Sequence, residues 1–289
     1  MRKIISFLIV LSIVLVNMGC TEKKHRELRL AISPWIGYSP LYFAEEQGWL
    51  KEAGITLIHS TSLHETIHYF QASLVDAFVS TQYEAEILNS KVMHLMPLDR
   101  SNGGDVLLSN RSLGTIKKSN NITTYLEIES INRLILDDFI NKYKLPFTNF
   151  KLINKDQALV KQLLPRADED MLIVTYEPYA TMLRNKGFNQ IASTRDSDLF
   201  VLDSIYLHER VWKEQKDKAK HLKSLIKKAY VKLKENPEAY YKAVKSYLEE
   251  PTYEEFIQSL ATIKWYIDRP HGEFEKLFKT HQILELREP

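Results

Sequence analysis

The segment His64-Glu65-Thr66-Ile67-His68 matches the H-E-x-x-H pattern of zinc peptidases. In those enzymes two histidines four residues apart on a helix bind zinc, and the glutamate acts as the base. Here Ser62 and Glu65 also form the pattern of a helix-capping box, which gives the glutamate a structural role in the first turn. The extended motif would place Gly and His where Gln71 and Leu74 stand. These two observations weaken the match, so we keep a zinc-dependent hydrolase or peptidase only as the alternative function.

Other catalytic signatures are missing from the sequence. It has neither common Gly-rich phosphate loop and no Gly-x-Ser-x-Gly nucleophile elbow. The single cysteine, Cys20, is better explained as a lipid acceptor than as a nucleophile. We therefore expect a binding protein rather than an enzyme, with no catalytic residues, no cofactor and no resident metal. Metal binding by His59, His64 and His68 stays open.

Aromatic and polar side chains gather where expected strands end. The apolar run Leu28–Ile32 leads into Ser33-Pro34-Trp35-Ile36-Gly37-Tyr38, and Ser39-Pro40 reads as a helix N-cap followed by proline at the first helical position. In an open α/β sheet, ligands bind at the carboxyl ends of the strands; the alternative for each aromatic residue is core packing. The candidate ligand-binding residues are Ser33, Trp35, Tyr38, Ser80, Thr81, Gln82, Tyr83, Ser101, Asn102, Glu127, Tyr176, Glu177 and Tyr179.

The elements that must position these residues alternate between strand and helix, which predicts βαβ units, a largely parallel sheet and an α/β fold. Two glycines within Ser101–Asp105 interrupt the first block and indicate a bend between two sheets. The expected strands are Leu28–Ser33, Ile55–Ser60, Val75–Ser80, Val92–Pro97, Ile122–Glu127, Phe147–Ile153, Met171–Tyr176 and the long extended run Leu199–Leu207. The expected helices are Pro40–Gln47, Ser62–Phe70, Tyr83–Asn89, Ile131–Tyr143, Asp156–Leu164 and Tyr179–Lys186.

From Glu209 onward the sequence is rich in Lys and Glu and has helical periodicity. Acidic residues are interleaved with the lysines, and an apolar stripe accompanies them, so the charged face is expected to be solvated rather than a basic binding patch. The stripe consists of Leu222, Leu225, Ile226, Tyr230 and Leu233.

The N-terminus has the layout of a secretory signal. Arg2 and Lys3 precede the largely apolar run Ile4–Val16, and Met18-Gly19 stands before Cys20. A lone cysteine after a signal core and a glycine resembles the lipid acceptor of a bacterial lipoprotein, although Asn17 replaces the usual leucine. We expect residues 1–19 to be a signal peptide and Cys20 to carry the lipid.

The charge balance argues against nucleic-acid binding. The chain has 39 Lys and Arg against 37 Asp and Glu, and removal of residues 1–19 takes away Arg2 and Lys3, which leaves 37 of each sign. A general nucleic-acid binder needs a basic surplus to neutralise phosphates. We therefore expect no nucleic-acid partner.

Four segments in register resemble the solute-binding proteins of ABC importers, in the branch that takes up nitrate, sulfonates, taurine and thiamine pyrimidine precursors. Residues 35–42, Trp-Ile-Gly-Tyr-Ser-Pro-Leu-Tyr, resemble that family's first ligand loop, and Val75–Ser80 resembles its interior strand before a ligand loop. Ser101–Leu108 resembles its first crossover, and Tyr176-Glu177-Pro178-Tyr179 its second-lobe ligand loop. The similarity runs from about Leu28 to His208.

The resemblance implies a two-lobed periplasmic-binding-protein type II fold with two crossover strands and a small-molecule ligand in the cleft. The expected divisions are 1–19 signal peptide, 20–27 lipid-anchored tether, 28–100 lobe 1, 101–200 lobe 2, and 201–289 return strand and C-terminal helices packing on lobe 1. It also implies delivery to an ABC permease and its ATPase subunit by two-lobe closure. We expect a monomer at the cell membrane, anchored by lipid on Cys20 and facing the periplasm or outside.

One segment departs from the family pattern and bears on the ligand. After the strand Ile122–Glu127 the family usually has a small, Gly-rich turn, but here the chain reads Glu127-Ile128-Glu129-Ser130-Ile131. Two carboxylates beside a helix start would repel an anion. The expected ligand is therefore a small polar or amine-bearing organic molecule, with aromatic and pyrimidine-like compounds among the candidates.

Overall fold

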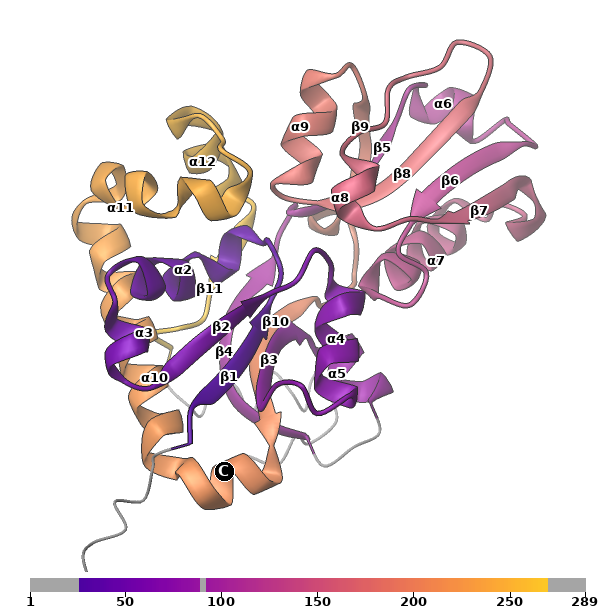
Figure 1. Cartoon of the computed structure of the whole chain (residues 1–289). Helices are drawn as coiled ribbons and strands as arrows, with labels where there is room; N and C mark the ends of the chain where they lie inside the picture. The colour runs from indigo at the N-terminus through magenta and orange to yellow at the C-terminus, as the bar shows by residue number, and fades with distance from the viewer. Residues whose placement is uncertain (1–25, 89–91, 270–289) are drawn as a thin grey trace, which may run out of the picture.

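The computed structural model describes residues 26–88 and 92–269, and the chain forms two lobes, each built on its own sheet (Figure 1). The predicted signal peptide and the lipid acceptor Cys20 lie outside the described residues. The first sheet has the order β11-β4-β10-β3-β1-β2, and the second has the order β7-β6-β8-β5-β9. Periplasmic-binding-protein architecture, with two crossing segments between α/β lobes, is therefore confirmed at the level of the fold.

Buried apolar strands form the first sheet. Its parallel part is β1 (Leu28–Ile32) between β2 (Ile55–His59) and β3 (Ala77–Thr81). All of β3 is buried, as expected of a strand covered on both faces. β10 (Leu202–His208) pairs antiparallel with β3 and β4 (Val92–Ser101), and the short β11 (Ile263–Trp265) closes the edge. The sheet is therefore mixed, because strands that connect the lobes return in the opposite direction.

The second sheet repeats the same mixture. β6 (Ile122–Leu126) pairs parallel with β7 (Phe150–Asn154) and β8 (Asp170–Tyr176). β5 (Asp105–Ser109) pairs antiparallel with β8 and with β9 (Asn189–Ser193). β5 starts and β8 ends at the side of the sheet that faces the first lobe.

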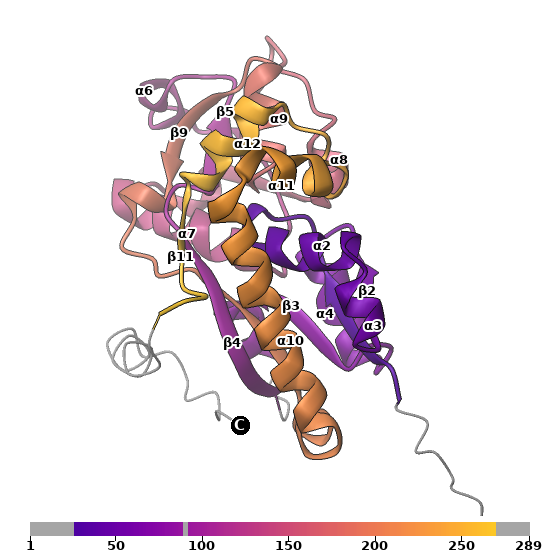
Figure 2. The ribbon, with the colours of Figure 1, turned by 90° about the vertical axis from the view of Figure 1, so that its left-hand side faces the viewer.

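Helices cover the sheets, and the loops that connect strands to helices lie at the strand ends. In the first lobe these are α2 (Ser39–Glu46), α3 (Trp49–Glu52), α4 (Leu63–Gln71) and α5 (Gln82–Ile87). In the second lobe they are α6 (Leu113–Ile116), α7 (Ile131–Tyr143), α8 (Gln157–Val160) and α9 (Tyr179–Asn185). The C-terminal helices α10 (Glu209–Glu235), α11 (Pro237–Val244) and α12 (Tyr253–Leu260) return to the first lobe, where α10 and α11 pack on α2 (Figure 2).

The apolar stripe predicted for α10 is buried against the first lobe, and the lysines between its members face outward. Contact with α2 explains the stripe, because a helix of mostly charged residues is stable here only through its apolar face. The chain kinks at Gln215, which has non-helical dihedrals of −133° and 32°.

Two crossing segments form the connection between the lobes. The first runs from β4 through 102–104 into β5, and the second runs from β9 through 194–201 into β10. Ser101 donates its backbone N–H to Val201 at 3.0 Å, and its hydroxyl lies 2.7 Å from the hydroxyl of Thr194. Thr194 Oγ1 also accepts the N–H of Gly103 at 2.9 Å. These bonds tie the two crossings to each other.

Three local predictions need correction. The strand expected over Phe147–Ile153 starts only at Phe150, because residues 147–149 form a 3₁₀ turn. The sequence pattern predicts Ser39 as the N-cap of the first helix, but residues 36–38 form a 3₁₀ turn that runs directly into α2, so Ser39 already has helical dihedrals of −52° and −29°. The helix expected over Asp156–Leu164 covers only Gln157–Val160. Pro165 disfavours helical geometry at Leu164, the residue before it, and so sets only the last position that the helix could reach.

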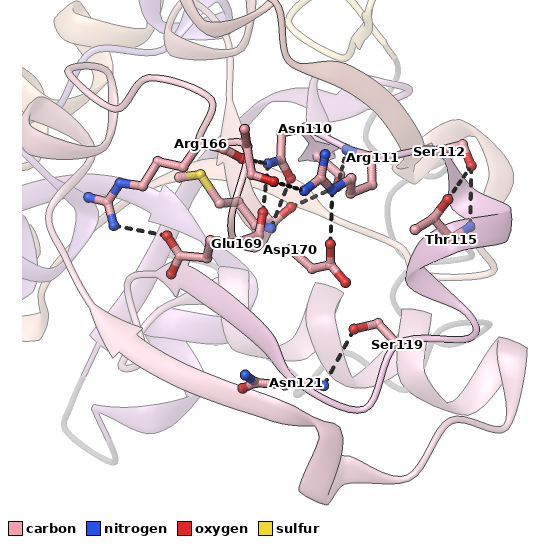
Figure 3. A network of polar contacts seen from close by, with 12 residues as sticks. Asn110, Arg111, Ser112, Thr115, Ser119, Asn121, Arg166, Glu169 and Asp170 are labelled. Carbon is pink, nitrogen blue, oxygen red and sulfur yellow. Dashed lines mark hydrogen bonds and ion pairs between the residues drawn. The ribbon is translucent and has the colours of Figure 1, made fainter.

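A polar network closes the second lobe at the end remote from the crossings (Figure 3). Arg111 donates to Asp170 at 2.9 Å, and Asn110 bonds the carbonyl of Glu169 at 2.8 Å and the N–H of Met171 at 2.9 Å. These contacts join the end of β5 to the start of β8. Within residues 26–88 and 92–269, no helix has the length and apolar character needed to cross a membrane.

Candidate functional site

A small cavity lies between the lobes, where strand ends of both sheets meet. The carboxyl ends of β1, β3 and β8 reach it, and β5 starts beside it. Its lining residues are Ser33, Trp35, Tyr38, Leu63, Thr81, Asp105, Ile131, Tyr176 and Asp203. The free volume of the cavity is only about 10 Å³, about enough for one water molecule. The walls from the two lobes therefore lie close together here, and they must move apart before an organic ligand can enter.

Aromatic side chains from both lobes form the walls. Trp35 meets Tyr176 edge to face, with ring centroids 6.0 Å apart and an interplanar angle of 78°, and Tyr179 meets Tyr176 at 5.6 Å. Trp35 is only 4% exposed. Its position depends on Gly104, because a Cβ there would lie 2.4 Å from the Trp35 ring. The first crossing thus leaves room for the indole by having no side chain at this position.

Two aspartates from the crossing strands lie beside each other behind the loop of residues 33–38. Asp99 of β4 pairs directly with Asp203 of β10 in the sheet register. Trp35 Nε1 donates to Asp99 Oδ1 at 3.1 Å, and Tyr38 OH donates to Asp203 Oδ1 at 2.5 Å. Gly37 packs against the Asp99 carboxyl, since a Cβ on Gly37 would lie 1.8 Å from Oδ2. The aromatic residues of the loop are therefore oriented by buried acids.

Further buried acids surround the cavity. Burial raises the pKa of Asp105 to about 7, although a hydrogen bond from Ser101 opposes the rise and Glu84 adds to it. Burial also raises the pKa of Glu127 to about 8, against the N–H of Gln157, which donates to its carboxylate at 3.1 Å. The pKa values of Asp99 and Asp203 are raised well above the ordinary value for the same reason and through repulsion between neighbouring carboxyls. Concentrated negative charge is thus costly while the cavity holds no positive partner.

Several buried polar atoms at the cavity or directly behind it have no hydrogen-bond partner among the described residues. They are Ser33 Oγ, Asp99 Oδ2, Asp105 Oδ2, Glu127 Oε2 and Tyr176 OH. Buried polar groups are normally satisfied, so unsatisfied ones concentrated in one place need a reason such as a bound ligand. Three of the five are carboxylate oxygens, which would accept N–H or O–H donors. None of the described residues that line the cavity is Lys, Arg or His.

The start of α7 is the point where an anion would bind most readily, and it is already occupied. Glu84 Oε1 of the first lobe accepts the N–H of Ile131, the first residue of α7, at 2.7 Å. Ser80 holds the other oxygen at 3.1 Å, and Thr81 donates to it from its N–H and hydroxyl. Burial raises the pKa of Glu84, although these donors oppose the rise. A carboxylate at a helix N-terminus is favourable and leaves no free N–H there for a second anion.

Five of the sequence-predicted residues line the cavity: Ser33, Trp35, Tyr38, Thr81 and Tyr176. Others lie close by and have supporting contacts. Ser80 bonds Glu84, and Gln82 bonds the carbonyl of Phe200 and the N–H of Leu202, which ties α5 to the second crossing. Ser101 joins the two crossings, and Asn102 donates its N–H to the carbonyl of Thr262.

The remaining predicted residues lie elsewhere or at the edge of the site. Glu177 is fully buried, pairs with Arg184 at 2.5 Å and accepts the N–H of Thr181 at 3.1 Å, so it stabilises the start of α9 instead of lining the cavity. The Tyr179 ring packs edge to face against Tyr176. Tyr83 is partly buried on α5. Glu127 lies behind the cavity, and its carboxylate oxygen Oε2 has no hydrogen-bond partner among the described residues.

The candidate residues predicted from the sequence do not include Asp99, Asp105, Asp203 or Glu84. A usable signal was present for the strand acids. Leu98-Asp99 and Leu202-Asp203 each place an acid directly after an apolar residue in a strand that is otherwise buried. Acidic residues are rarely buried without a partner, so such positions indicate a site.

The H-E-x-x-H segment lacks the arrangement of a peptidase. Glu65 accepts the N–H of Thr61 at 2.6 Å and the hydroxyls of Thr61 and Tyr69, and the N–H of Glu65 bonds Ser62 at 3.1 Å. Partial burial favours a higher pKa for Glu65, but together these donors outweigh it and the pKa is lowered. The carboxylate is therefore held in the helix cap and is poorly placed to act as a base.

Comparison with known proteins locates the chain by fold. No protein-family profile and no curated protein matches its sequence. The ligand-binding component of an ABC-type import system from Staphylococcus aureus, solved with zinc bound, is 14% identical and has a TM-score of 0.68, covering 90% of this chain and 93% of that chain. The periplasmic aliphatic sulphonate-binding protein SsuA from Escherichia coli is 11% identical, with a TM-score of 0.67 and coverage of 90% and 94%. The Candida albicans CA3427 gene product, described as having the generic periplasmic binding protein fold, is 14% identical, with a TM-score of 0.65 and coverage of 90% and 91%.

Proposed function

We propose that this protein is an extracytoplasmic solute-binding protein that delivers a small cationic organic molecule to an ABC importer. The observation that carries the proposal is the set of buried carboxyls, with unsatisfied oxygens, around a cavity between two lobes. The shared fold of bacterial ABC import components supports the transport role.

The charge of the site selects the class of ligand. Asp105 and Tyr176 offer unpaired acceptors at the cavity, Asp203 also lines it, and Asp99 lies beside Asp203 behind it. A ligand with a protonated amine, amidine or aminopyrimidine group would donate hydrogen bonds to them and neutralise their charge. Its apolar part would lie against Trp35, where cation–π attraction adds to the binding of a positive group.

The aliphatic sulphonate bound by the Escherichia coli protein is a poor guide to the ligand of this chain. Glu84 already occupies the N-terminus of α7, and described residues lining the cavity carry no positive charge. A sulfonate would place a second negative charge among five buried carboxyls, which low-dielectric surroundings make unfavourable.

Closure of the two lobes is the proposed transport signal. The contacts between Trp35 and Tyr176 and between Glu84 and Ile131 join the first lobe to the second. A ligand that contacts both walls favours the closed form by its difference in affinity for the two forms. The permease with its ATPase subunit then recognises the closed protein.

The proposed location is the outer face of the cell membrane, with a lipid on Cys20 after removal of residues 1–19. The basic start, apolar core and Gly19-Cys20 pair support this part of the proposal. Replacement of Cys20 by Ser should move the protein from the membrane fraction to the soluble fraction. Retention of the Cys20→Ser variant in washed membranes would contradict lipid anchoring.

The decisive experiment is isothermal titration of two matched sets of small molecules. One set contains amines, amidines and aminopyrimidines, and the other contains sulfonates and carboxylates of the same size. The Asp105→Asn variant should lose affinity for every cationic hit, whereas Asp170→Asn, at the far end of the second lobe, should keep it. Tight binding of a sulfonate, or unchanged affinity in Asp105→Asn, would overturn the proposal.

A further inference from the structure

A second cluster of chemically active side chains lies outside the cavity, at the boundary between the lobes. His64 and His68 stand one turn apart on α4 of the first lobe, with ring centroids 4.1 Å apart. Glu129 belongs to the loop between β6 and α7 of the second lobe. Its carboxylate reaches across the boundary, and Oε2 lies 3.4 Å from His64 Nδ1.

The spacing of the three side chains suits a metal ion. One ligand atom from each of His64, His68 and Glu129 lies within 4.8 Å of the others. In a tetrahedral zinc site with bonds of about 2.0–2.1 Å, neighbouring ligand atoms are about 3.3 Å apart. The His64–Glu129 distance already matches this value. His68 and Glu129 are exposed, so small rotations of their side chains would complete the arrangement.

The three side chains suit a divalent ion of borderline softness, and they leave one of its coordination positions unfilled by protein. Two imidazoles and one carboxylate are ligands that zinc accepts, and water would fill the fourth position. Glu65, between the two histidines in sequence, is held by Thr61 and Tyr69. The site therefore lacks the base of a peptidase, and the metal would bind without a hydrolytic step.

We propose that His64, His68 and Glu129 bind one zinc-like divalent ion that joins the two lobes. Because Glu129 comes from the second lobe, all three ligands are together only when the lobes are closed. The ion therefore favours the closed form, and by thermodynamic reciprocity an organic ligand that closes the lobes tightens metal binding by the same factor. This coupling rests on the proposed two-lobe closure, whereas the metal site itself is independent of it.

Titration of Zn²⁺ into the chelator-washed full chain, with no organic ligand present, tests the site. We expect one ion per chain, and affinity reduced about tenfold or more in His64→Gln, His68→Gln and Glu129→Gln. His59→Gln is the matched control, because His59 pairs with Glu45 at 2.9 Å and stacks on Tyr247, away from the cluster. Loss of binding in His59→Gln would overturn this ligand set.

The Glu129→Gln variant decides whether the ion joins the lobes. Two histidines four residues apart on a helix can hold a metal weakly alone, so unchanged affinity in Glu129→Gln would overturn the inter-lobe site. Small-angle scattering should show that zinc compacts the wild-type chain and leaves Glu129→Gln unchanged. Absence of stoichiometric binding, an adventitious ion only, or binding without compaction would each count against the proposal. Binding of cationic organic ligands in EDTA is measured separately, so failure of the metal site and failure of the proposed function are distinguishable.

Discussion

Replacement of Asp105 by Asn tests the claim that ionisation of this buried carboxyl destabilises the ligand-free protein. Asp105 is fully buried at the start of β5, with one oxygen unpartnered. Asn has nearly the same shape as a protonated aspartate and never ionises. The difference in unfolding free energy between the two proteins therefore reports the ionisation of this one carboxyl.

The magnitude follows from the pKa. Burial raises the Asp105 pKa from 3.8 to about 7, and each pKa unit corresponds to about 1.4 kcal/mol. Because the folded-state pKa is the higher one, its stabilising contribution is complete below pH 3.8 and disappears as the pH rises through 7. The whole contribution is about 4 kcal/mol, of which about 3 kcal/mol falls between pH 5 and pH 9.

The assay is urea unfolding of both proteins at several pH values in that window, without ligand. The Asn variant should gain about 3 kcal/mol relative to wild type between pH 5 and pH 9, with unchanged m-values. Asp170→Asn is the control. Hydrogen bonds from Ser119 and Arg111 lower the pKa of Asp170, so its contribution is lost only at acid pH and its difference from wild type should be flat in this window.

The reasoning is refuted if the difference in unfolding free energy between wild type and Asp105→Asn stays constant within about 0.5 kcal/mol from pH 5 to pH 9. It would mean that water or a flexible closure solvates Asp105 as well as the unfolded chain does. The acidic cavity would then give no reason to favour a cationic ligand.

The same geometry makes three further predictions. The affinity for a cation that pairs with Asp105 should rise about tenfold from pH 6 to pH 8, because binding requires the ionised carboxyl with a pKa of about 7; calorimetry at both pH values checks this, and a falling affinity would contradict it. Gly37→Ala should lower stability by about 1–3 kcal/mol in thermal unfolding, because the new Cβ would overlap the Asp99 carboxyl, and an unchanged melting temperature would show that the loop can shift freely. Arg184→Met should cost about 2–3 kcal/mol in urea unfolding, because it leaves the Glu177 carboxylate buried without its cation; rescue by Glu177→Gln in the same chain would confirm the cause.

The local parts of the site could be predicted from the sequence, because they depend on chain segments a few residues long. Trp35, Tyr38 and Tyr176 stand at strand ends that hydropathy and turn residues identify. The capping pattern of Ser62 and Glu65 is confirmed in part: Ser62 accepts the N–H of Glu65, whereas the Glu65 carboxylate accepts the N–H of Thr61, one residue before the cap.

The acidic character of the cavity depends on pairings between distant segments. Asp99 and Asp203 become neighbours only through the antiparallel register of β4 and β10. Glu84 meets Ile131 only when the lobes approach each other. Glu177 is the opposite case. Its motif predicts a ligand contact, but the Glu177 carboxylate forms an ion pair with Arg184. Spacing in one chain contains no information on such partners.

Under the proposed transport function, the bond between Glu84 and α7 has a consequence for the fidelity of import. This bond stabilises the closed form whether or not a solute is bound. A permease that recognises only the closed form would therefore also respond to the empty protein. The cost of ionising the buried Asp105 opposes this effect, because it destabilises a closed protein that holds no cation and a bound cation relieves it. Acid conditions protonate Asp105 and remove this cost. The ratio of ATP hydrolysed to solute imported should therefore rise as the medium becomes more acidic.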